Sequence, residues 1–410
     1  MSERRERAQR AKHAVTRAVR AGIATDLHHG AVVAPIHLSS TFAFDGFGKK
    51  RTYDYTRTGN PTRDYLAQAL AELEGGLRGV VTSTGMAAVN LVLQLIRPGD
   101  LVVAAHDCYG GTHRLLRSLA ARGHFEVLFT DLTCDGAPDL VRVERPRLLW
   151  IETPSNPLLR ITDLERVIAA GHDAGAIVAV DNTFLSPVLQ RPLELGADLV
   201  VHSTTKYLNG HSDVVGGAVV TADASLGEEM AWWANCLGIT GAPFDSFLTL
   251  RGLRTLHPRM DAHERNAKAV VAALADHPAV RRIYYPGLTS HSGHEIACRQ
   301  QDGFGAMVSV ELEGGIAGVE TFVNALGCFT LAESLGGVES LVAHPATMTH
   351  ASMDEAARRN AGIDDCLVRL SVGIEHVDDL VDDVTAALDA VAASAQDDVG
   401  EVRLGVEASV

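Results

Sequence analysis

One lysine follows closely on an apolar run near the middle of the chain. Residues 197–201 are mostly apolar, and Ser203, Thr204 and Thr205 stand between them and Lys206. Burying an ammonium group is costly, whereas a lysine with a lowered pKa presents a neutral amine that can form a Schiff base. The flanking hydroxyl groups are donors suited to a phosphate. The segment therefore indicates pyridoxal 5′-phosphate attached at Lys206, although an isolated Ser-x-x-Lys pattern more often marks a surface lysine in a loop.

Pyridoxal chemistry needs further groups, and the chain offers a candidate for each. A carboxylate beside the pyridine nitrogen keeps that nitrogen protonated, and we assign this role to Asp181 at the end of an apolar run. Tyr109 can stack on the ring. A phosphate needs several donors. The expected donors are the backbone amides of Gly85 and Met86 at a helix start, the hydroxyls of Ser203 and Thr205, and the side chains of Tyr55 and Arg57. For Gly85 an ordinary strand-to-helix turn is an equally good interpretation.

A charged residue interrupts an apolar strand near the C-terminus. Arg369 lies in the run Leu-Val-Arg-Leu-Ser-Val-Gly at residues 367–373. A guanidinium can grip the α-carboxylate of an amino acid through two parallel hydrogen bonds. Because a charged residue in a core is rarely left unpaired, a structural ion pair is an equally good explanation of this arginine.

Apolar runs alternate with helical patterns through the first two thirds of the chain. Strands are expected near residues 101–105, 148–151, 177–180 and 197–201. This alternation predicts a mostly parallel sheet with helices on both faces, in which ligands bind beyond the carboxyl ends of the strands. Each of four candidate residues comes just after a predicted strand, so we expect them to share a site. These residues are Tyr109, Asn156, Asp181 and Lys206.

Local signals predict where two helices begin. Asn60 and Pro61 are typical of the cap and the first position of a helix. Thr162 and Glu165 have the spacing of a capping box that opens a second helix. The pattern of the whole chain predicts three parts, namely an N-terminal arm over residues 1–60, a cofactor-binding domain over 61–264 and a smaller C-terminal α/β domain over 265–410.

The composition excludes several classes of function. The 410 residues carry a net charge of −15, from 36 basic and 51 acidic residues, which argues against a nucleic-acid partner. The six cysteines form no CxxC pair, so we expect neither a zinc site nor a disulfide framework, and a reducing cytoplasm fits. We expect no bound metal. Neither a secretory signal nor an apolar stretch of membrane-spanning length is visible, and so no membrane partner is expected.

At this point the motifs are recognisable, and the chain resembles the Cys/Met-metabolism family of pyridoxal-phosphate enzymes. The matching segments extend from about residue 30 to 380. They include YDYTRTGNPTRDYLAQALAELEGG, TSTGMAAVNLVL, AHDCYGGTHRL, ETPSNPLLRITD, VDNTFLSPVLQRPLELGADLVVHSTTKYLNGHSDVVGG and LVRLSVGIE. The resemblance implies the aspartate-aminotransferase-like fold, called fold type I, with a large domain on a mostly parallel sheet and a smaller C-terminal α/β domain.

The resemblance also implies a homotetramer, a dimer of dimers, in which Tyr55 and Arg57 reach the phosphate in the neighbouring chain. Lys206 would be the Schiff-base lysine, Asp181 the partner of the pyridinium and Tyr109 the stacking ring. The residues that it places around the substrate are Asn156, Ser334 and Arg369 near the α-carboxylate and Arg114 and Glu333 at the distal end, with Asp54 a weaker candidate.

The family contains synthases and lyases that share most of these residues. Glu333 can hold a distal ammonium group, which favours reactions at Cγ of cystathionine or its precursors. Gly111 stands where the methionine γ-lyases characteristically carry a cysteine. We therefore expect a γ-replacement that joins an O-acylhomoserine, first O-succinylhomoserine, to L-cysteine and gives L-cystathionine. The alternatives are α,γ-elimination of cystathionine, homocysteine synthesis with sulfide, and transamination.

Overall fold

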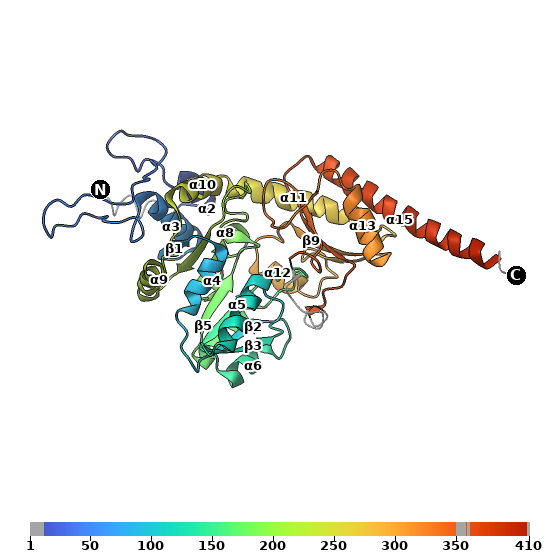
Figure 1. Ribbon diagram of the computed structural model, residues 1–410, viewed down its shortest axis with the longest axis horizontal. Coiled ribbons are helices and arrows are strands. Elements are labelled where there is room, and N and C mark those ends of the chain that lie inside the picture. Colours follow the sequence, from blue (N-terminus) through green and yellow to red (C-terminus); the bar gives the residue numbers. More distant parts are fainter. Residues whose placement is uncertain (1–11, 350–357, 359–360, 408–410) are drawn as a thin grey trace. The chain divides into compact units, whose positions relative to one another are not determined.

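The computed structural model describes residues 12–349, 358 and 361–407 and divides into two compact units (Figure 1). Unit 1 comprises Met1–Thr153 and Thr162–Pro258, and unit 2 comprises Pro154–Ile161 and Arg259–Val410. Residues 1–11 of the predicted arm lie outside the described residues. The domain limits at residues 60 and 264 stay a prediction.

Unit 1 is built on a sheet whose described strands follow the order β1-β7-β6-β5-β4-β2-β3. These strands are β1 (Arg78–Thr82), β2 (Leu101–Ala105), β3 (Glu126–Thr130), β4 (Leu148–Glu152), β5 (Ile177–Asp181), β6 (Leu199–Ser203) and β7 (Gly217–Thr221). Strand β7 is antiparallel to both of its neighbours, and the other pairs are parallel. The predicted mostly parallel sheet is confirmed.

Helices cover both faces of this sheet. The helical elements of unit 1 are α2 (Ala14–Arg20), α3 (Pro61–Glu74), α4 (Gly85–Leu93), α5 (Gly110–Ala121), α6 (Ala137–Glu144), α7 (Leu164–Ala174), α8 (Ser186–Leu189), η1 (Pro192–Leu195), α9 (Ala224–Leu237) and α10 (Pro243–Leu253). Alternate residues of β4 point to opposite faces. Leu148 and Trp150 pack in the core that contains α4 and α9, whereas Leu149 and Ile151 pack with α6 and α7. A strand that is apolar on both faces is typical of a parallel sheet between two helical layers.

The caps of two helices show how local sequence sets their boundaries. At α3, Oδ1 of Asn60 accepts hydrogen bonds from the backbone N–H groups of Thr62 and Arg63, at 2.9 and 3.4 Å, as predicted. The capping box predicted at Thr162 lies one residue before the cap that the structure shows, which is Asp163. Helix α7 begins one residue later, because the Asp163 carboxylate accepts from the N–H of Arg166 at 3.3 Å. The backbone N–H of Thr162 instead donates to Oγ1 of Thr153 at 3.1 Å.

Unit 2 contains a second sheet, in the order β10-β11-β12-β9-β8 among the described residues. Its strands are β8 (Val280–Tyr284), β9 (Met307–Leu312), β10 (Thr330–Leu331), β11 (Leu341–Ala343) and β12 (Leu367–Ser371). Its helices are α12 (His294–Gln300), α13 (Gly315–Ala325) and α15 (Val377–Glu407), together with most of α11 (Leu256–Leu274). Val270 of α11, Phe322 of α13 and Leu388 of α15 pack in one buried core with β9 and β12. Figure 1 shows α13 and α15, in orange and red, beside one another.

Crossing a bilayer requires a long and strongly apolar helix. Over the part of the chain that the structure describes, no helix meets that requirement.

Candidate active site

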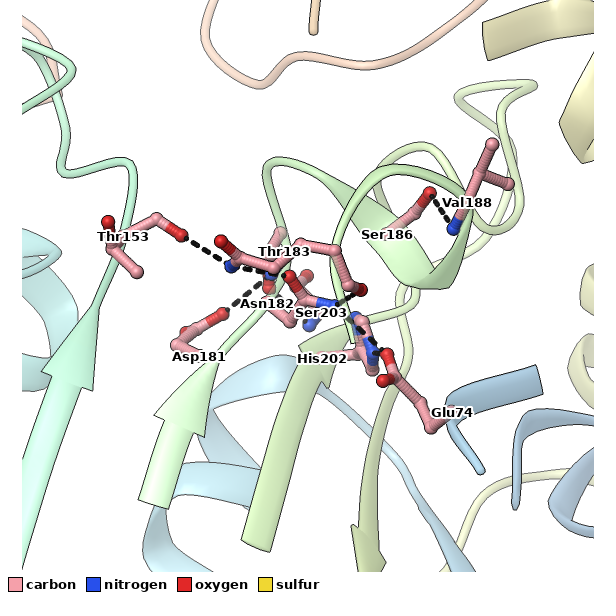
Figure 2. Close-up of polar contacts among 10 residues, drawn as sticks. Glu74, Thr153, Asp181, Asn182, Thr183, Ser186, Val188, His202 and Ser203 are labelled. Carbon is pink, nitrogen blue, oxygen red and sulfur yellow. Dashed lines mark hydrogen bonds and ion pairs between the residues drawn. The ribbon is translucent and has the colours of Figure 1, made fainter. Parts of the chain in front are cut away.

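The carboxyl ends of β4, β5 and β6 meet at one edge of the unit 1 sheet. Glu152 on β4 is paired in register with Asp181 on β5, and Asp181 is paired with Val201 on β6. Figure 2 shows Asp181 and Ser203 where their strands end. Lys206 follows in a tight turn, in which its N–H donates to the Ser203 carbonyl at 3.3 Å and its carbonyl accepts from the N–H of Gly210 at 2.8 Å. The lysine side chain is half-buried. As expected, Lys206 lies just beyond the end of β6.

The start of α4 abuts the end of β6. Helix α4 begins at Gly85 because Oγ1 of Thr84 accepts from the N–H of Ala87 at 2.9 Å. A Cβ atom on Gly85 would lie 2.8 Å from Cβ of Ser203, a distance that side chains do not tolerate. The glycine therefore brings the first amides of the helix, which carry positive partial charge, beside a serine hydroxyl.

Thr205, the other predicted hydroxyl donor, forms hydrogen bonds with the backbone of Gly216. Its Oγ1 accepts from the N–H of Gly216 at 3.0 Å and lies 3.3 Å from the Gly216 carbonyl as a donor. The hydroxyl is thus oriented by the segment that leads into β7. Gly85 and Ser203 form a donor set whose chemistry suits a phosphate group, and Thr205 joins them only if its one hydroxyl hydrogen turns away from the Gly216 carbonyl.

Asp181 has an environment with opposing effects on its charge. Burial raises the pKa of this carboxyl, while hydrogen bonds from Thr183 and the charge of His202 act to lower it. The N–H of Thr183 donates to Oδ1 of Asp181 at 3.0 Å. Because an ionised aspartate in a partly buried position needs a cation, the site fits a protonated pyridine ring. Pyridoxal phosphate is thus compatible with the residues present.

Tyr109 is anchored through its backbone. Its N–H donates to Oε2 of Glu152 at 2.7 Å, and α5 begins at the next residue. The Tyr109 side chain is 44% exposed, which leaves ring surface for stacking. A Cβ atom on Gly111 would lie 2.6 Å from Cε1 of Tyr109 and 2.8 Å from Sδ of Met86. Glycine at position 111 therefore lets the tyrosine ring and Met86 pack closely.

Three other predicted residues of unit 1 are more exposed. Tyr55 and Arg57 line a cavity of about 370 Å³ that Ser83 and Thr204 also line. Nη1 of Arg57 donates to the Asn235 carbonyl at 3.2 Å. Arg114 lies on α5 with its side chain exposed. The contact of Tyr55 and Arg57 with a phosphate in a neighbouring chain stays a prediction. Asp54, the weaker candidate, is held in an ion pair with Lys50 at 2.8 Å.

In unit 2 the structure brings together the three residues predicted for the α-carboxylate. Arg369 on β12 is buried, and it donates through Nη1 to Oδ1 of Asn156 at 2.9 Å and through Nη2 to the Ser334 carbonyl at 2.8 Å. Ser334 has φ of 91°, a backbone conformation that non-glycine residues rarely adopt and that is often found at functional sites. Glu333, the residue before it, is exposed. Both hydrogen-bond partners are oxygen atoms of uncharged groups, which orient the guanidinium in a defined plane.

Sequence reasoning missed three buried ionisable residues beside the site. Glu152 ends β4, and burial and the neighbouring Asp181 raise its pKa well above the ordinary value. Glu74 and His202 are both fully buried and lie 2.5 Å apart, Oε1 to Nε2. Both belong to segments quoted for the resemblance, and the one sequence signal was that His202 directly follows the apolar run at 199–201.

Comparison with known proteins gives consistent matches along most of the chain. The family model described as "Cys/Met metabolism PLP-dependent enzyme" matches residues 15–389. The chain is 55% identical over 370 residues to cystathionine gamma-synthase of Escherichia coli (strain K12), covering 90% of this chain and 96% of that protein. It is 46% identical over 378 residues to cystathionine beta-lyase of Coxiella burnetii, covering 92% of this chain and 98% of that protein.

A solved structure gives the same result in three dimensions. The crystal structure of cystathionine gamma synthase from Xanthomonas oryzae pv. oryzae in complex with aminoacrylate and cysteine superposes with a TM-score of 0.92 at 60% identity. The match covers 93% of this chain and 99% of that chain. The resemblance drawn from the motifs and the predicted fold are confirmed, and this chain belongs to the family of Cys/Met metabolism enzymes that depend on pyridoxal phosphate.

Proposed function

We propose that this chain joins O-succinylhomoserine to L-cysteine and gives L-cystathionine and succinate. The observation that carries the proposal is the order of the identities. The chain is 55% identical to the Escherichia coli synthase and 60% identical to the Xanthomonas oryzae synthase, against 46% for a β-lyase and 40% for the γ-lyase of Lactobacillus plantarum. A second structure of the Xanthomonas synthase is a complex with cystathionine. The closest alternative reaction uses O-acetylhomoserine as the acyl donor in place of O-succinylhomoserine.

Lys206 is the residue that moves protons in this proposal. Pyridoxal phosphate, when bound, supplies an electron sink that stabilises negative charge next to Cα of an amino acid. Once the substrate amine has replaced the lysine, Nζ of Lys206 takes the proton from Cα and then exchanges protons at Cβ. The acyl group leaves Cγ as a carboxylate, and the thiolate sulfur of cysteine adds at Cγ. One C–O bond breaks and one C–S bond forms, and the thiol proton accompanies the released acid.

Asp181 and Tyr109 hold the cofactor ring. An ionised Asp181 favours the protonated pyridine nitrogen, and the ring thereby withdraws electrons more strongly. Tyr109 stacks on the ring face, and its side-chain oxygen takes the thiol proton of the incoming cysteine, a step that requires the phenolate form. Gly85, Met86, Ser203 and Thr205 supply donors to the phosphate through the positive end of α4 and through hydroxyl groups.

Arg369 binds the α-carboxylate of the amino acid through its forked guanidinium, with Asn156 and Ser334 beside it. The whole chain has a net charge of −15, so an anionic substrate requires such a local cation. At the distal end Arg114 takes the succinyl carboxylate and Glu333 takes the ammonium group of the incoming cysteine. Both side chains are exposed and thus accessible to a ligand.

We further propose that the active form is a homotetramer, a dimer of dimers, in the cytoplasm. Tyr55 and Arg57 contact the phosphate bound by the neighbouring chain, which agrees with their position in an irregular segment before α3. Large exposed apolar residues such as Phe47 and Trp232 are suited to contact with further copies. All six cysteines are free thiols, as a reducing compartment favours.

The test is product analysis with the purified, cofactor-loaded protein. With O-succinylhomoserine and cysteine we expect cystathionine and succinate in equal amounts. O-acetylhomoserine and O-phosphohomoserine serve as competing donors, and sulfide serves as a competing thiol. Lys206→Arg is the matched control because it keeps a cation in the turn but removes the amine. Formation of homocysteine from sulfide at a higher rate than cystathionine from cysteine would contradict the choice of thiol.

A γ-lyase is the second candidate, because a structure of that class at 40% identity also covers 93% of this chain. The lyase reaction converts cystathionine to cysteine, 2-oxobutanoate and ammonia. If cystathionine is cleaved rapidly while no cystathionine forms from the two precursors, the lyase assignment replaces the one proposed here. Formation of keto acids from amino acids without release of ammonia would instead identify an aminotransferase.

A further inference from the structure

A glutamate and a histidine form a fully buried pair next to the strand ends that carry Asp181 and Ser203. Glu74 is the last residue of α3 and His202 lies in β6, and neither side chain is accessible to solvent. Figure 2 shows the two side chains facing one another. Their contact, Oε1 to Nε2, is 2.5 Å long. Because the lone pairs of a carboxylate oxygen and a bare imidazole nitrogen repel at this distance, a proton lies between the two atoms.

Burial determines how many protons the pair carries. A carboxylate next to a neutral ring would leave a net negative charge in the interior, which is very costly without compensation. A second proton makes the pair neutral overall, either as carboxylate and imidazolium or as carboxylic acid and imidazole. In both forms Nδ1 of His202 carries a hydrogen, and in the carboxylate–imidazolium form the positive charge lies on the histidine. Within the described residues neither this Nδ1 nor Oε2 of Glu74 has a hydrogen-bond partner.

The pair is tied to the residue next to Asp181. The same Oε1 of Glu74 accepts from Nδ2 of Asn182 at 3.0 Å, and this Nδ2 also donates to the Gln190 carbonyl at 2.7 Å. Nε2 of Gln190 donates to the Thr153 carbonyl at 3.1 Å. One buried carboxylate thus connects the end of α3 with the segments that follow β4 and β5 and with β6 itself. Figure 2 shows Asn182 between these groups.

The charges around Asp181 are unevenly distributed. Glu152 lies beside it on β4, and Asp107 follows β2. Burial and the charges of Asp181 and Asp107 raise the pKa of Glu152, so a further negative charge at this edge is unfavourable. On β6 the positive end of the pair is His202, and Lys206 lies in the turn beyond. At the end of α3, the exposed pair of Arg191 and Glu194, 3.3 Å apart, contributes little because solvent screens it.

We propose that Glu74 and His202 act together as positioning residues, which fix the end of β5 and keep Asp181 ionised for the ring nitrogen of the cofactor. The register of the sheet supports this role, because Asp181 is paired with Val201, the residue before His202. Burial raises the pKa of Asp181, and the charge of His202 acts in the opposite direction. The inference rests on the role proposed for Asp181 and does not depend on which thiol or acyl donor the enzyme uses.

The test follows release of the cofactor on acidification, because a protonated Asp181 no longer binds a pyridinium. Glu74→Gln and His202→Gln each remove one charge of the pair with little change in volume. Glu72→Gln is the matched control, since Glu72 lies on the same helix and its carboxylate accepts from Nε2 of Gln68 at 2.9 Å. Each holoenzyme is equilibrated from pH 8 to pH 4, and retained pyridoxal phosphate is measured by absorbance after gel filtration.

We expect wild type and Glu72→Gln to share one midpoint of release. Without the positive end of the pair, Asp181 is protonated at a higher pH, so both pair variants should release the cofactor at a midpoint about one pH unit higher. A purely structural pair would weaken retention by the same factor at every pH and leave the midpoint unchanged. That result overturns the proposal.

Two further measurements keep the outcome decisive. Circular dichroism shows whether each variant folds, and if His202→Gln does not, the midpoint of Glu74→Gln decides. Asp181→Asn tests the underlying assignment, because it should retain less cofactor at every pH and lose the acid midpoint. If Asp181→Asn keeps the wild-type midpoint, the inference about Glu74 and His202 fails. If that variant still forms cystathionine, the proposed reaction is unaffected.

Discussion

Nη1 of Arg369 donates to Oδ1 of Asn156 at 2.9 Å, which joins two residues that are 213 positions apart in the chain. Asn156 lies in the segment Pro154–Ile161, which leaves the sheet of unit 1 and belongs to unit 2. The Ser334 carbonyl accepts from Nη2 of the same guanidinium at 2.8 Å. The arginine is thereby oriented by two distant segments of unit 2, as a residue that must present a planar fork to a carboxylate requires.

Replacing this arginine with lysine should impair binding of the amino acid. Lysine keeps the charge but cannot contact Asn156 and the Ser334 carbonyl while it also binds both oxygens of a carboxylate. For Arg369→Lys we expect kcat/KM for O-succinylhomoserine to fall about 100-fold, mainly through KM, as loss of a hydrogen bond to a charged group implies. Steady-state kinetics measure the effect. Arg281→Lys, at an exposed pair with Glu313 of 3.6 Å, is the control and should stay within about twofold.

Lys206 should be the covalent attachment point of the cofactor. Reduction of the holoenzyme with borohydride fixes a Schiff base as a stable amine, and peptide mapping then locates it. We expect the modified peptide to contain Lys206 and to be absent from Lys206→Arg. Modification of a peptide elsewhere in the chain would contradict the assignment, whatever the activity of the variant.

A methyl group at position 111 should disturb the stacking tyrosine. The added Cβ would lie 2.6 Å from Cε1 of Tyr109 and 2.8 Å from Sδ of Met86, so the ring must shift. Because a small misplacement of a positioned group lowers rates strongly, we expect kcat of Gly111→Ala to fall by about tenfold or more. The absorbance band of the bound cofactor should also shift. Gly136→Ala is the control, since its Cβ would meet no atom within 4 Å. Equal kinetics for both variants would show that Tyr109 adapts.

The alternation of apolar strands and helices was sufficient to predict β2, β4, β5 and β6 of unit 1, because a buried parallel strand requires a short apolar run. The expected strands did not include β3 or the antiparallel β7. The convergence of Tyr109, Asp181 and Lys206 follows from the same pattern, since parallel strands end at one edge. Local signals were less reliable. The start of α7 was predicted one residue too early, because the Asp163 carboxylate accepts from the N–H of Arg166.

The buried pair could not be predicted from the sequence. Glu74 and His202 are 128 positions apart, and a contact at that separation has no periodic signal. Its existence depends on how the end of α3 packs against β6. The anchoring of Tyr109 by Glu152 is similar, because it links the turn after β2 to β4 through a side chain. Strand-end motifs identify the residues that face a ligand, whereas the groups that support them are set by tertiary packing.

Glutamine should replace Glu152 with little loss, because the raised pKa of this carboxyl favours its uncharged form. Burial and the charge of Asp181 raise its pKa well above 4.5. In Glu152→Gln the side-chain carbonyl still accepts from the N–H of Tyr109, so we expect activity at pH 7 within about twofold of wild type. Glu152→Ala removes that acceptor, and we expect it to lose at least about tenfold in kcat/KM. A large loss in Glu152→Gln would show that the negative charge itself is required.

The same substitution should change how stability depends on pH. Above pH 4.5 the folded wild type retains a proton on Glu152 that the unfolded chain loses, so the contribution of this carboxyl to stability falls as the pH rises. Glutamine has no proton to lose. The stability of Glu152→Gln relative to wild type should thus increase between pH 5 and pH 8, by at most about 1.4 kcal/mol per pH unit. Thermal unfolding at both pH values measures the change. Glu126→Gln, an exposed residue on β3, should give no such trend, and a trend of opposite sign in Glu152→Gln would mean that the carboxyl is ionised in the folded chain.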